Sequence, residues 1–413
     1  MSIKKLIILI ILLALTGCKN NDPIYLSGDK FQLVQYPPVP VVKTNQTKIF
    51  VHYMPWYESR EINGYWGNHW TMANRNPDLI NNKGQRQIAS YFYPLIGPYS
   101  SMDKDLIEYH LLLMKLCGID GVLIDWYGSY DVYDYNQIKI NSEALISMLN
   151  MVGLKFGIVY EDYTTQNVVN QHKAGSAVEA SQNDIEYLDN NYFSSDQYII
   201  INNSPLLLVF GPRYLQTPND WDQVFSAVHV SPCFLTLWYE SSEAGDNARG
   251  EFSWVYRNNL ADLDNFYNNR ASNFETAIGS AYPGFKDYYT EGGWPNLALG
   301  WQVPYDSTST FSETLQRAEQ ANIPYVQLVT WNDFGEGTMI EPTIEFGYSL
   351  LEQVQQFAGV SYSKTDLQLV YNLYSLRKDY TGNNDVQLKL DQVFYYLVSL
   401  QIDKAKELLN SIQ

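Results

Sequence analysis

Eight short apolar runs recur along the middle of the chain, and amphipathic stretches separate most of them. The apolar runs cover residues 48–54, 120–126, 155–161, 205–210, 233–239, 252–256, 274–281 and 325–331. Helical spacing of apolar residues occurs in 106–117, 141–152, 177–188, 221–228, 260–267 and 312–321. Strands that alternate with helices form parallel sheets. Eight such units favour the α/β class and a (β/α)8 TIM-type barrel. A doubly wound sheet is the alternative, but no glycine fingerprint follows the first strand.

The N-terminal residues 1–17 have the pattern of a secreted protein's leader. Lys4 and Lys5 precede an apolar run that is too short to span a membrane stably. The run ends in small residues directly before Cys18, a pattern typical of a bacterial lipoprotein signal peptide. We therefore expect acylation of Cys18, for example with palmitate, and a mature protein anchored on the periplasmic or cell-surface face of a bacterial membrane.

The remaining chain divides into three parts. Residues 18–46 are polar at first and proline-rich around 36–40, which predicts a tether. The barrel is expected over 47–360. In 361–413, apolar residues recur with helical spacing on both sides of a break at 381–384, so we predict a small helical appendage packed on the barrel.

Composition excludes several classes of partner and cofactor. The formal net charge is −18, which makes nucleic acid and anionic lipid surfaces unsuitable partners. The chain holds 34 Tyr and 10 Trp, many of them outside the apolar runs, and such rings suit a hydroxyl-rich ligand. Cys117 and Cys233 lie in apolar runs and are expected in the core. No Cys/His spacing predicts a metal site, no glycine-rich loop predicts a phosphate site, and no cofactor is expected.

Residues able to do chemistry gather at the ends of the predicted strands, where a barrel places its active site. Five of these ends carry an aromatic ring, and nearly all carry an acid or a histidine. Each residue alone has a structural explanation, such as a helix cap or a buried histidine, but their coincidence on one face predicts a site. The predicted substrate-binding residues are Glu161, Asp125, Trp126, Tyr53, Trp56, Tyr57, His52, His69, Trp66, Tyr239, Trp331 and Asn332.

The segment 331–342, which follows the last predicted strand, holds two carboxylates within four residues. Asp333 and Glu336 are interleaved with the rings of Trp331 and Phe334, and glycines between them allow sharp turns. Glycoside hydrolysis needs one acid that keeps its proton and one that has lost it, beside flat apolar rings. A pair of solvated loop acids is the simpler interpretation, and the other strand ends argue against it.

Three segments together resemble a known family. These are 52–57 (His-Tyr-Met-Pro-Trp-Tyr), 118–122 and the segment 331–342, and they are similar to the glycoside hydrolase family 99 endo-α-mannosidases and their family 71-like relatives. The resemblance covers about residues 47 to 345. Glu336 matches the family's general acid. Asp333 matches its general base, but as Asp where the family has Glu, which moves the carboxylate by about 1.5 Å.

The resemblance implies retaining endo-hydrolysis of an α-linked, mannose-rich glycan. The base would deprotonate the sugar's own 2-hydroxyl, which then displaces the leaving group and gives a 1,2-anhydro sugar. Glu336 would protonate the leaving oxygen, and Glu161 matches a substrate-contacting acid. The partners expected are an oligo- or polysaccharide, the membrane through the lipid anchor, and other glycan-utilisation proteins.

Two further interpretations remain open. One is a surface glycan-binding lipoprotein on a degenerate barrel, in which Asp333 marks lost chemistry. The other is a glycosidase of different specificity on the same barrel, such as an α-1,3-glucan hydrolase. A purely structural lipoprotein fits the aromatic and acidic strand ends poorly.

Overall fold

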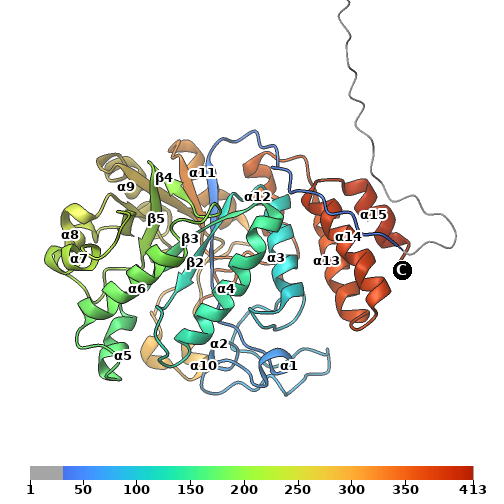
Figure 1. Ribbon diagram of the computed structural model, residues 1–413, viewed down its shortest axis with the longest axis horizontal. Helices are drawn as coiled ribbons and strands as arrows, with labels where there is room; N and C mark the ends of the chain where they lie inside the picture. Colours follow the sequence, from blue (N-terminus) through green and yellow to red (C-terminus); the bar gives the residue numbers. More distant parts are fainter. Residues whose placement is uncertain (1–30, 413) are drawn as a thin grey trace, which may run out of the picture.

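Eight parallel strands close into a barrel in the computed structural model, which describes residues 31–412 (Figure 1). Their neighbour order is β3-β2-β1-β9-β8-β7-β6-β5, and pairing of β3 with β5 closes the sheet. The prediction of a (β/α)8 barrel is confirmed. The strands are β1 (Lys48–Tyr53), β2 (Gly121–Trp126), β3 (Lys155–Tyr160), β5 (Ser204–Val209), β6 (Cys233–Leu237), β7 (Gly250–Phe252), β8 (Thr276–Ala281) and β9 (Tyr325–Leu328).

Helices surround the barrel and also cover its C-terminal mouth. The amphipathic stretches predicted from the sequence all become helices, while the short mouth helices, α12 and the two-residue strand β4 (Ile200–Ile201) had no expected counterpart. The α-helices are α1 (Arg60–Asn63), α2 (Asn68–Thr71), α3 (Lys104–Leu116), α4 (Tyr135–Val152), α5 (Thr164–Asn170), α6 (Ala177–Asn191), α7 (Pro218–Phe225), α8 (Ser241–Ala244), α9 (Leu260–Asn269), α10 (Tyr289–Gly292), α11 (Ser309–Gln320), α12 (Ser349–Ala358), α13 (Lys364–Asp379), α14 (Asn384–Val398) and α15 (Ile402–Asn410). The 3-10 helices are η1 (Gly245–Asn247), η2 (Ala271–Asn273) and η3 (Pro295–Leu297).

The sixth barrel strand begins two residues earlier and ends four residues earlier than predicted. The sequence indicated 252–256, whereas β7 is Gly250–Phe252. A side chain at Gly250 would place its Cβ 1.7 Å from the carbonyl oxygen of Thr276, so only glycine allows this approach of β7 to β8. As a result Trp254 lies beyond the strand, at the mouth of the barrel.

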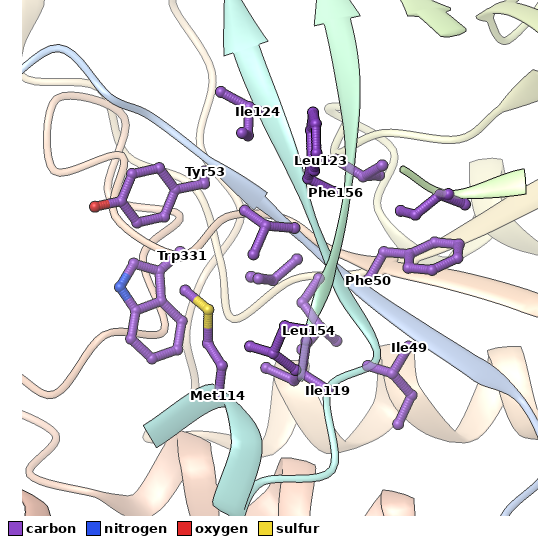
Figure 2. Close-up of a cluster of buried hydrophobic side chains, with 14 of the residues drawn as sticks. Ile49, Phe50, Tyr53, Met114, Ile119, Leu123, Ile124, Leu154, Phe156 and Trp331 are labelled. Atoms are coloured by element: carbon purple, nitrogen blue, oxygen red, sulfur yellow. The ribbon is translucent and has the colours of Figure 1, made fainter. Parts of the chain in front are cut away.

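Side chains alternate between the inside of the barrel and the layer of helices. His52 of β1 meets Trp254 across the barrel, with ring centroids 4.7 Å apart, so it points inward. Its neighbour Tyr53 points outward and bonds to His110 of α3. Figure 2 shows Tyr53 and Trp331 grouped with Met114 of α3, among apolar side chains of the first strands.

The described part of the predicted tether, residues 31–46, is attached to the fold. The backbone N–H of Val39 donates to the carbonyl of Val398, and those of Thr44 and Asn45 donate to Gly359 and Ala358. In Figure 1 this segment runs from the α13–α15 helices to β1. The tether prediction is therefore corrected for residues 31–46. A polar and proline-rich segment can still form hydrogen bonds along the surface of the fold. The leader and Cys18 lie outside the described residues.

Within residues 31–412, no helix is long and apolar enough to cross a membrane.

The C-terminal helices α13, α14 and α15 pack together on one side of the barrel against α3 (Figure 1). A buried ion pair joins the two parts: Arg377 of α13 donates to both carboxylate oxygens of Glu108 of α3, at 3.1 and 2.8 Å. Arg377 also pairs with Asp391 of α14 at 2.7 Å. Burial raises the pKa of Glu108, and the Arg377 charge opposes that rise.

Arg377→Met is expected to destabilise the protein by about 3–5 kcal/mol, because it leaves the buried Glu108 carboxylate unpaired. Thermal and denaturant unfolding measure the change. The control is Lys378→Met at the next position, whose ammonium pairs with Asp103 and Asp105 at a partly exposed site and contributes about 0–1 kcal/mol. Equal losses in the two variants would contradict a special role for the buried pair.

Candidate active site

A tight loop after β9 carries the two acids predicted to be catalytic. The N–H of Asp333 donates to the hydroxyl of Thr330 at 2.8 Å, which turns the chain directly after the strand. The N–H of Glu336 then donates to Oδ1 of Asp333 at 2.9 Å. Asp333 is buried, with 4% of its surface exposed. The sequence spacing therefore brings both carboxyl groups to the same end of the barrel.

A cleft of about 910 Å³ opens beside Glu336 at the C-terminal ends of β5 to β8. Aromatic rings form much of its wall, and Tyr289 of α10 donates from its hydroxyl to Oε1 of Glu336 at 3.0 Å. Asp333 is not among the residues that line this cleft. The lining residues are Phe210, Arg213, Leu237, Trp238, Tyr239, Glu240, Trp254, Val255, Tyr256, Arg257, Asp262, Asn265, Phe285, Leu299, Trp301 and Glu336.

Burial makes both acids weak. Desolvation, followed by the charge of Asp333, raises the pKa of Glu336 to about 8, although the hydrogen bond from Tyr289 opposes the rise. Desolvation also raises the pKa of Asp333 to about 7; the N–H of Glu336 opposes that rise and the charge of Asp125 adds to it. Two interacting acids with pKa values near neutrality can share one proton at physiological pH.

Asp125 and His52 lie beneath these acids inside the barrel. His52 is 1% exposed and Asp125 is 2% exposed, and Nε2 of His52 is 3.9 Å from Oδ1 of Asp125. Nδ1 of His52 and Oδ2 of Asp125 have no hydrogen-bond partner among the described residues. Glu161 also belongs to this group: burial and the charges of Asp125, Asp162 and Glu336 hold its pKa well above the usual range. The floor of the mouth is therefore a cluster of interacting acids.

Tyr239 lines the cleft, and its position is fixed from behind. The N–H of Tyr239 donates to Oε2 of Glu251 at 2.9 Å, and Glu251 forms a buried ion pair with Arg270. The Arg270 guanidinium lies 4.6 Å from the centre of the Tyr239 ring. Tyr239 is 45% exposed, and its hydroxyl accepts from the side-chain amide of Asn265 at 2.5 Å.

Three predicted substrate-binding rings lie behind the strands instead. Tyr53 and Trp331 contact His110 of α3, and Trp126 stacks on Tyr187 of α6, with ring centroids 6.0 Å apart. All three are fully buried and do not line the cleft. We correct their assignment to packing residues, because Tyr53 and Trp126 lie on the outer face of their strands and Trp331, in the loop after β9, also points toward the helices.

Two further residues of the prediction hold the loops in place. Asn332 is fully buried and bonds both the N–H and the carbonyl of Met54 at the end of β1. The hydroxyl of Tyr57 donates to the carbonyl of Asn332 at 2.7 Å and accepts from the N–H of Phe334 at 3.2 Å. These bonds join the segment 331–334 to the end of β1, so we correct both residues from substrate contacts to positioning residues.

The remaining predicted rings belong to the long loop after β1. Trp56 stacks on His69, with ring centroids 4.1 Å apart, and burial lowers the pKa of His69 to about 3. Trp66 donates to Asp78 at 2.9 Å, and Arg86 lies over its ring. None of these residues lines the cleft beside Glu336.

Four residues at the mouth of the barrel, Trp254, Tyr289, Arg213 and Trp301, were not predicted from the sequence as site residues. The sequence placed Trp254 inside the predicted strand 252–256. Had that strand been predicted to end two residues earlier, Trp254 would have been counted among the residues at the strand ends. Tyr289 lies in the segment 287–291, in the loop after β8, and the acids beside the tyrosines of this segment are the signal that indicates it. Arg213 and Trp301 carried no signal, since each is a single residue in an irregular loop.

Among residues 31–412, no group of three or more His, Cys, Asp and Glu side chains is arranged to hold a metal ion.

Comparison with known proteins agrees with this geometry. The family model described as glycosyl hydrolase family 99 matches residues 44–243. The chain is 21% identical over 341 residues to the glycoprotein endo-alpha-1,2-mannosidase of Mus musculus, covering 71% of this chain and 68% of that protein. It is also 22% identical to the endo-alpha-1,2-mannosidase-like protein of the same organism, over 62% of this chain and 59% of that one.

A solved structure shares the fold. The GH99 endo-alpha-mannosidase from Bacteroides thetaiotaomicron superposes with a TM-score of 0.60 at 18% identity, covering 77% of this chain and 99% of that chain. The barrel, its acidic and aromatic mouth and these matches define a glycoside hydrolase. Within that class, the chain is most like glycoside hydrolase family 99, to which the matched family model and these relatives belong.

Proposed function

We propose that this protein hydrolyses α-linked, mannose-containing glycans within the chain and with retention of configuration, with Glu336 as general acid and Asp333 as general base. The observation that carries the proposal is the pair itself. Glu336 lies on the wall of an aromatic cleft, and its backbone N–H donates to Oδ1 of Asp333 at 2.9 Å. The mouse relative named an endo-alpha-1,2-mannosidase supports an α-mannose substrate.

The proposed first step uses both acids at once. The Asp333 carboxylate takes the proton of the sugar's 2-hydroxyl, and that oxygen forms a bond to C1 as the bond from C1 to the leaving oxygen breaks. Glu336 donates its proton to the leaving oxygen. The product is a 1,2-anhydro sugar, and the step requires a 2-hydroxyl anti to the leaving group, as the axial hydroxyl of an α-mannoside is.

The proposed second step restores the starting protonation. The Glu336 carboxylate takes a proton from water as the water oxygen bonds to C1 and the C1–O2 bond breaks. Asp333 returns its proton to O2. Two inversions at C1 give net retention, and both acids end as they began.

A second candidate function is glycan binding without turnover. The observation that favours it is the burial of Asp333, which does not line the cleft and has one oxygen occupied by the Glu336 N–H. The third candidate, an α-1,3-glucan hydrolase, would use the same cleft with a different sugar.

One assay separates the three candidates. The protein is incubated with a panel of α-mannans and α-1,3-glucans, and released oligosaccharides and retained polymer are both measured. Oligosaccharides released from α-mannan support the proposal, and release from α-glucan alone supports the third candidate. Retention of polymer with no product would overturn the proposal in favour of binding.

Activity is expected to follow a bell-shaped pH profile with its maximum between about pH 7 and 8. The base works only when ionised, so activity rises as the pH passes the Asp333 pKa of about 7. The acid works only when protonated, so activity falls above the Glu336 pKa of about 8. Measurement of kcat/KM against pH tests both limbs.

A matched variant tests the cause of the acidic limb. Asp125→Asn removes a nearby negative charge that raises the pKa of Asp333, so the acidic limb is expected to move to lower pH. An acidic limb that stays in place, with the variant still folded and active, would exclude Asp125 as its cause.

We also propose that Cys18 is the lipid attachment site of a membrane-anchored lipoprotein. The support is the leader pattern of residues 1–17 and the small residues before Cys18. Cys18→Ser is expected to block processing by the lipoprotein peptidase and incorporation of radioactive palmitate. Equal labelling of the variant and the parent protein would rule out this anchor.

A further inference from the structure

The exposed aromatic residues of residues 31–412 are all tyrosines, and all lie at one end of the barrel. No Trp or Phe in this range is exposed to the same degree. The six exposed rings are Tyr65 (49%), Tyr133 (70%), Tyr163 (53%), Tyr214 (43%), Tyr239 (45%) and Tyr256 (41%). We call these residues the rim tyrosines.

The rim tyrosines are distributed one to a loop around the mouth. They follow β1, β2, β3, β5, β6 and β7 in turn, at the end of the barrel that carries α2, α5 and α10 in Figure 1. The exposed apolar residues near the opposite end of the barrel have no aromatic ring, for example Val42, Met151 and Ile200. The tyrosines of the C-terminal helices α13 to α15 are not exposed to this degree. Exposure of rings is therefore a property of the mouth and not of the whole surface.

Only part of this row belongs to the cleft beside Glu336. Tyr239 and Tyr256 line the cleft, whereas Tyr65, Tyr133, Tyr163 and Tyr214 do not. The cleft lies over β5 to β8, so the rings after β1, β2 and β3 extend the aromatic surface to the other side of the mouth. A short oligosaccharide held in the cleft would leave these rings uncovered.

The loops that carry the rings beyond the cleft have an ordered backbone. Asp162, at the end of β3, is fully buried and accepts from the backbone N–H groups of Arg213, Tyr214 and Leu215 at 2.7 to 3.0 Å. These bonds join the loop of Tyr163, the next residue along, to the loop of Tyr214. On the far side, Tyr133 has a φ of 52°, a backbone conformation that L residues rarely adopt. A loop whose backbone is already ordered loses little freedom when a ligand covers its side chains.

We propose that the four rim tyrosines beyond the cleft, Tyr65, Tyr133, Tyr163 and Tyr214, bind the outer part of a long or branched neutral α-glycan whose cleaved bond lies in the cleft. The inference rests on the proposed function and adds the size of the substrate to it. Tyrosine suits this occupant because its ring faces the CH groups of a sugar while its hydroxyl bonds to sugar hydroxyls. The buried acids at the mouth and the net charge of −18 disfavour an anionic polymer.

The test compares a polymer with a short substrate. Tyr163→Ala/Tyr214→Ala is expected to raise KM for α-mannan by roughly three- to tenfold, with kcat unchanged. KM for a short α-manno-oligosaccharide should stay as in the parent protein. The matched control Met151→Ala/Ile200→Ala removes exposed side chains far from the mouth and should change neither value. Tyr163→Phe/Tyr214→Phe keeps the rings and should recover most of the affinity for the polymer.

Equal changes on the two substrates, or none on the polymer, would overturn the inference while the proposed function stands. If the parent protein hydrolyses no α-mannan, its mobility in native gels cast with α-mannan or α-1,3-glucan still tests the rim. If a polymer slows the migration of the parent protein but not that of the alanine variant, the inference is supported. If neither polymer slows the parent protein, the inference is overturned. A shift in sedimentation of the alanine variant would assign the rim to contact with a second copy and also overturn it.

Discussion

Glu336→Gln is expected to lower kcat on a natural α-linked glycan by at least about 10²-fold, because the amide cannot donate a proton to the leaving oxygen. The substitution keeps the shape of the side chain and the hydroxyl of Tyr289 can still donate to its oxygen. An activated aryl leaving group needs little protonation, so the loss on an aryl glycoside should be much smaller. Steady-state kinetics on both substrates measure the difference.

The control for this variant is Glu240→Gln. Glu240 lines the same cleft and also has a raised pKa, to about 7 through burial, but it is paired with Arg213. Replacement of Glu240 should reduce activity on the natural glycan and on the aryl glycoside by the same factor, because it weakens binding of both substrates. If Glu336→Gln likewise reduced both substrates by the same factor, Glu336 would be a binding or structural residue and not the general acid.

Asp333→Asn is expected to abolish turnover and leave glycan binding intact. An asparagine oxygen can still accept the N–H of Glu336, so the loop should keep its form, while the amide cannot deprotonate the 2-hydroxyl. Calorimetry with an oligosaccharide and product analysis measure the two effects separately. The parent protein should not cleave a 2-deoxy substrate by this mechanism, because that substrate lacks the attacking oxygen.

Asp333→Glu keeps a carboxylate one methylene further from the backbone and provides the conservative comparison. Turnover retained by Glu and lost with Asn would assign the base role to the carboxylate. Turnover that survives Asp333→Asn would exclude Asp333 as the base. A parent protein that binds α-glycans and hydrolyses none would favour the binding interpretation instead.

The order of the secondary structure was predictable because it depends on local patterns. Each apolar run indicated one buried strand, and each amphipathic stretch indicated one helix with a buried face. Eight such units close most simply into a barrel. Boundaries were less predictable: β7 began at Gly250 because of a close approach to Thr276, a residue 26 positions later in the chain. The tether prediction failed for 31–46 because its backbone–backbone bonds go to residues more than 300 positions away, such as Val398.

The sequence by itself determined the barrel and the short loop that holds Asp333 and Glu336 together, since both depend on spacing within a few residues. It did not determine which rings face the cleft. In a strand buried on both sides, either set of alternate residues can point inward, and apolar composition does not distinguish them. The closed barrel decides these directions. His52 and Asp125 point toward the acids, whereas Tyr53, Trp126 and Trp331 point toward the helices. The closed barrel also brought Trp254 and Tyr289 to the mouth from distant loops, because contacts between strands far apart in sequence exist only once the barrel has closed.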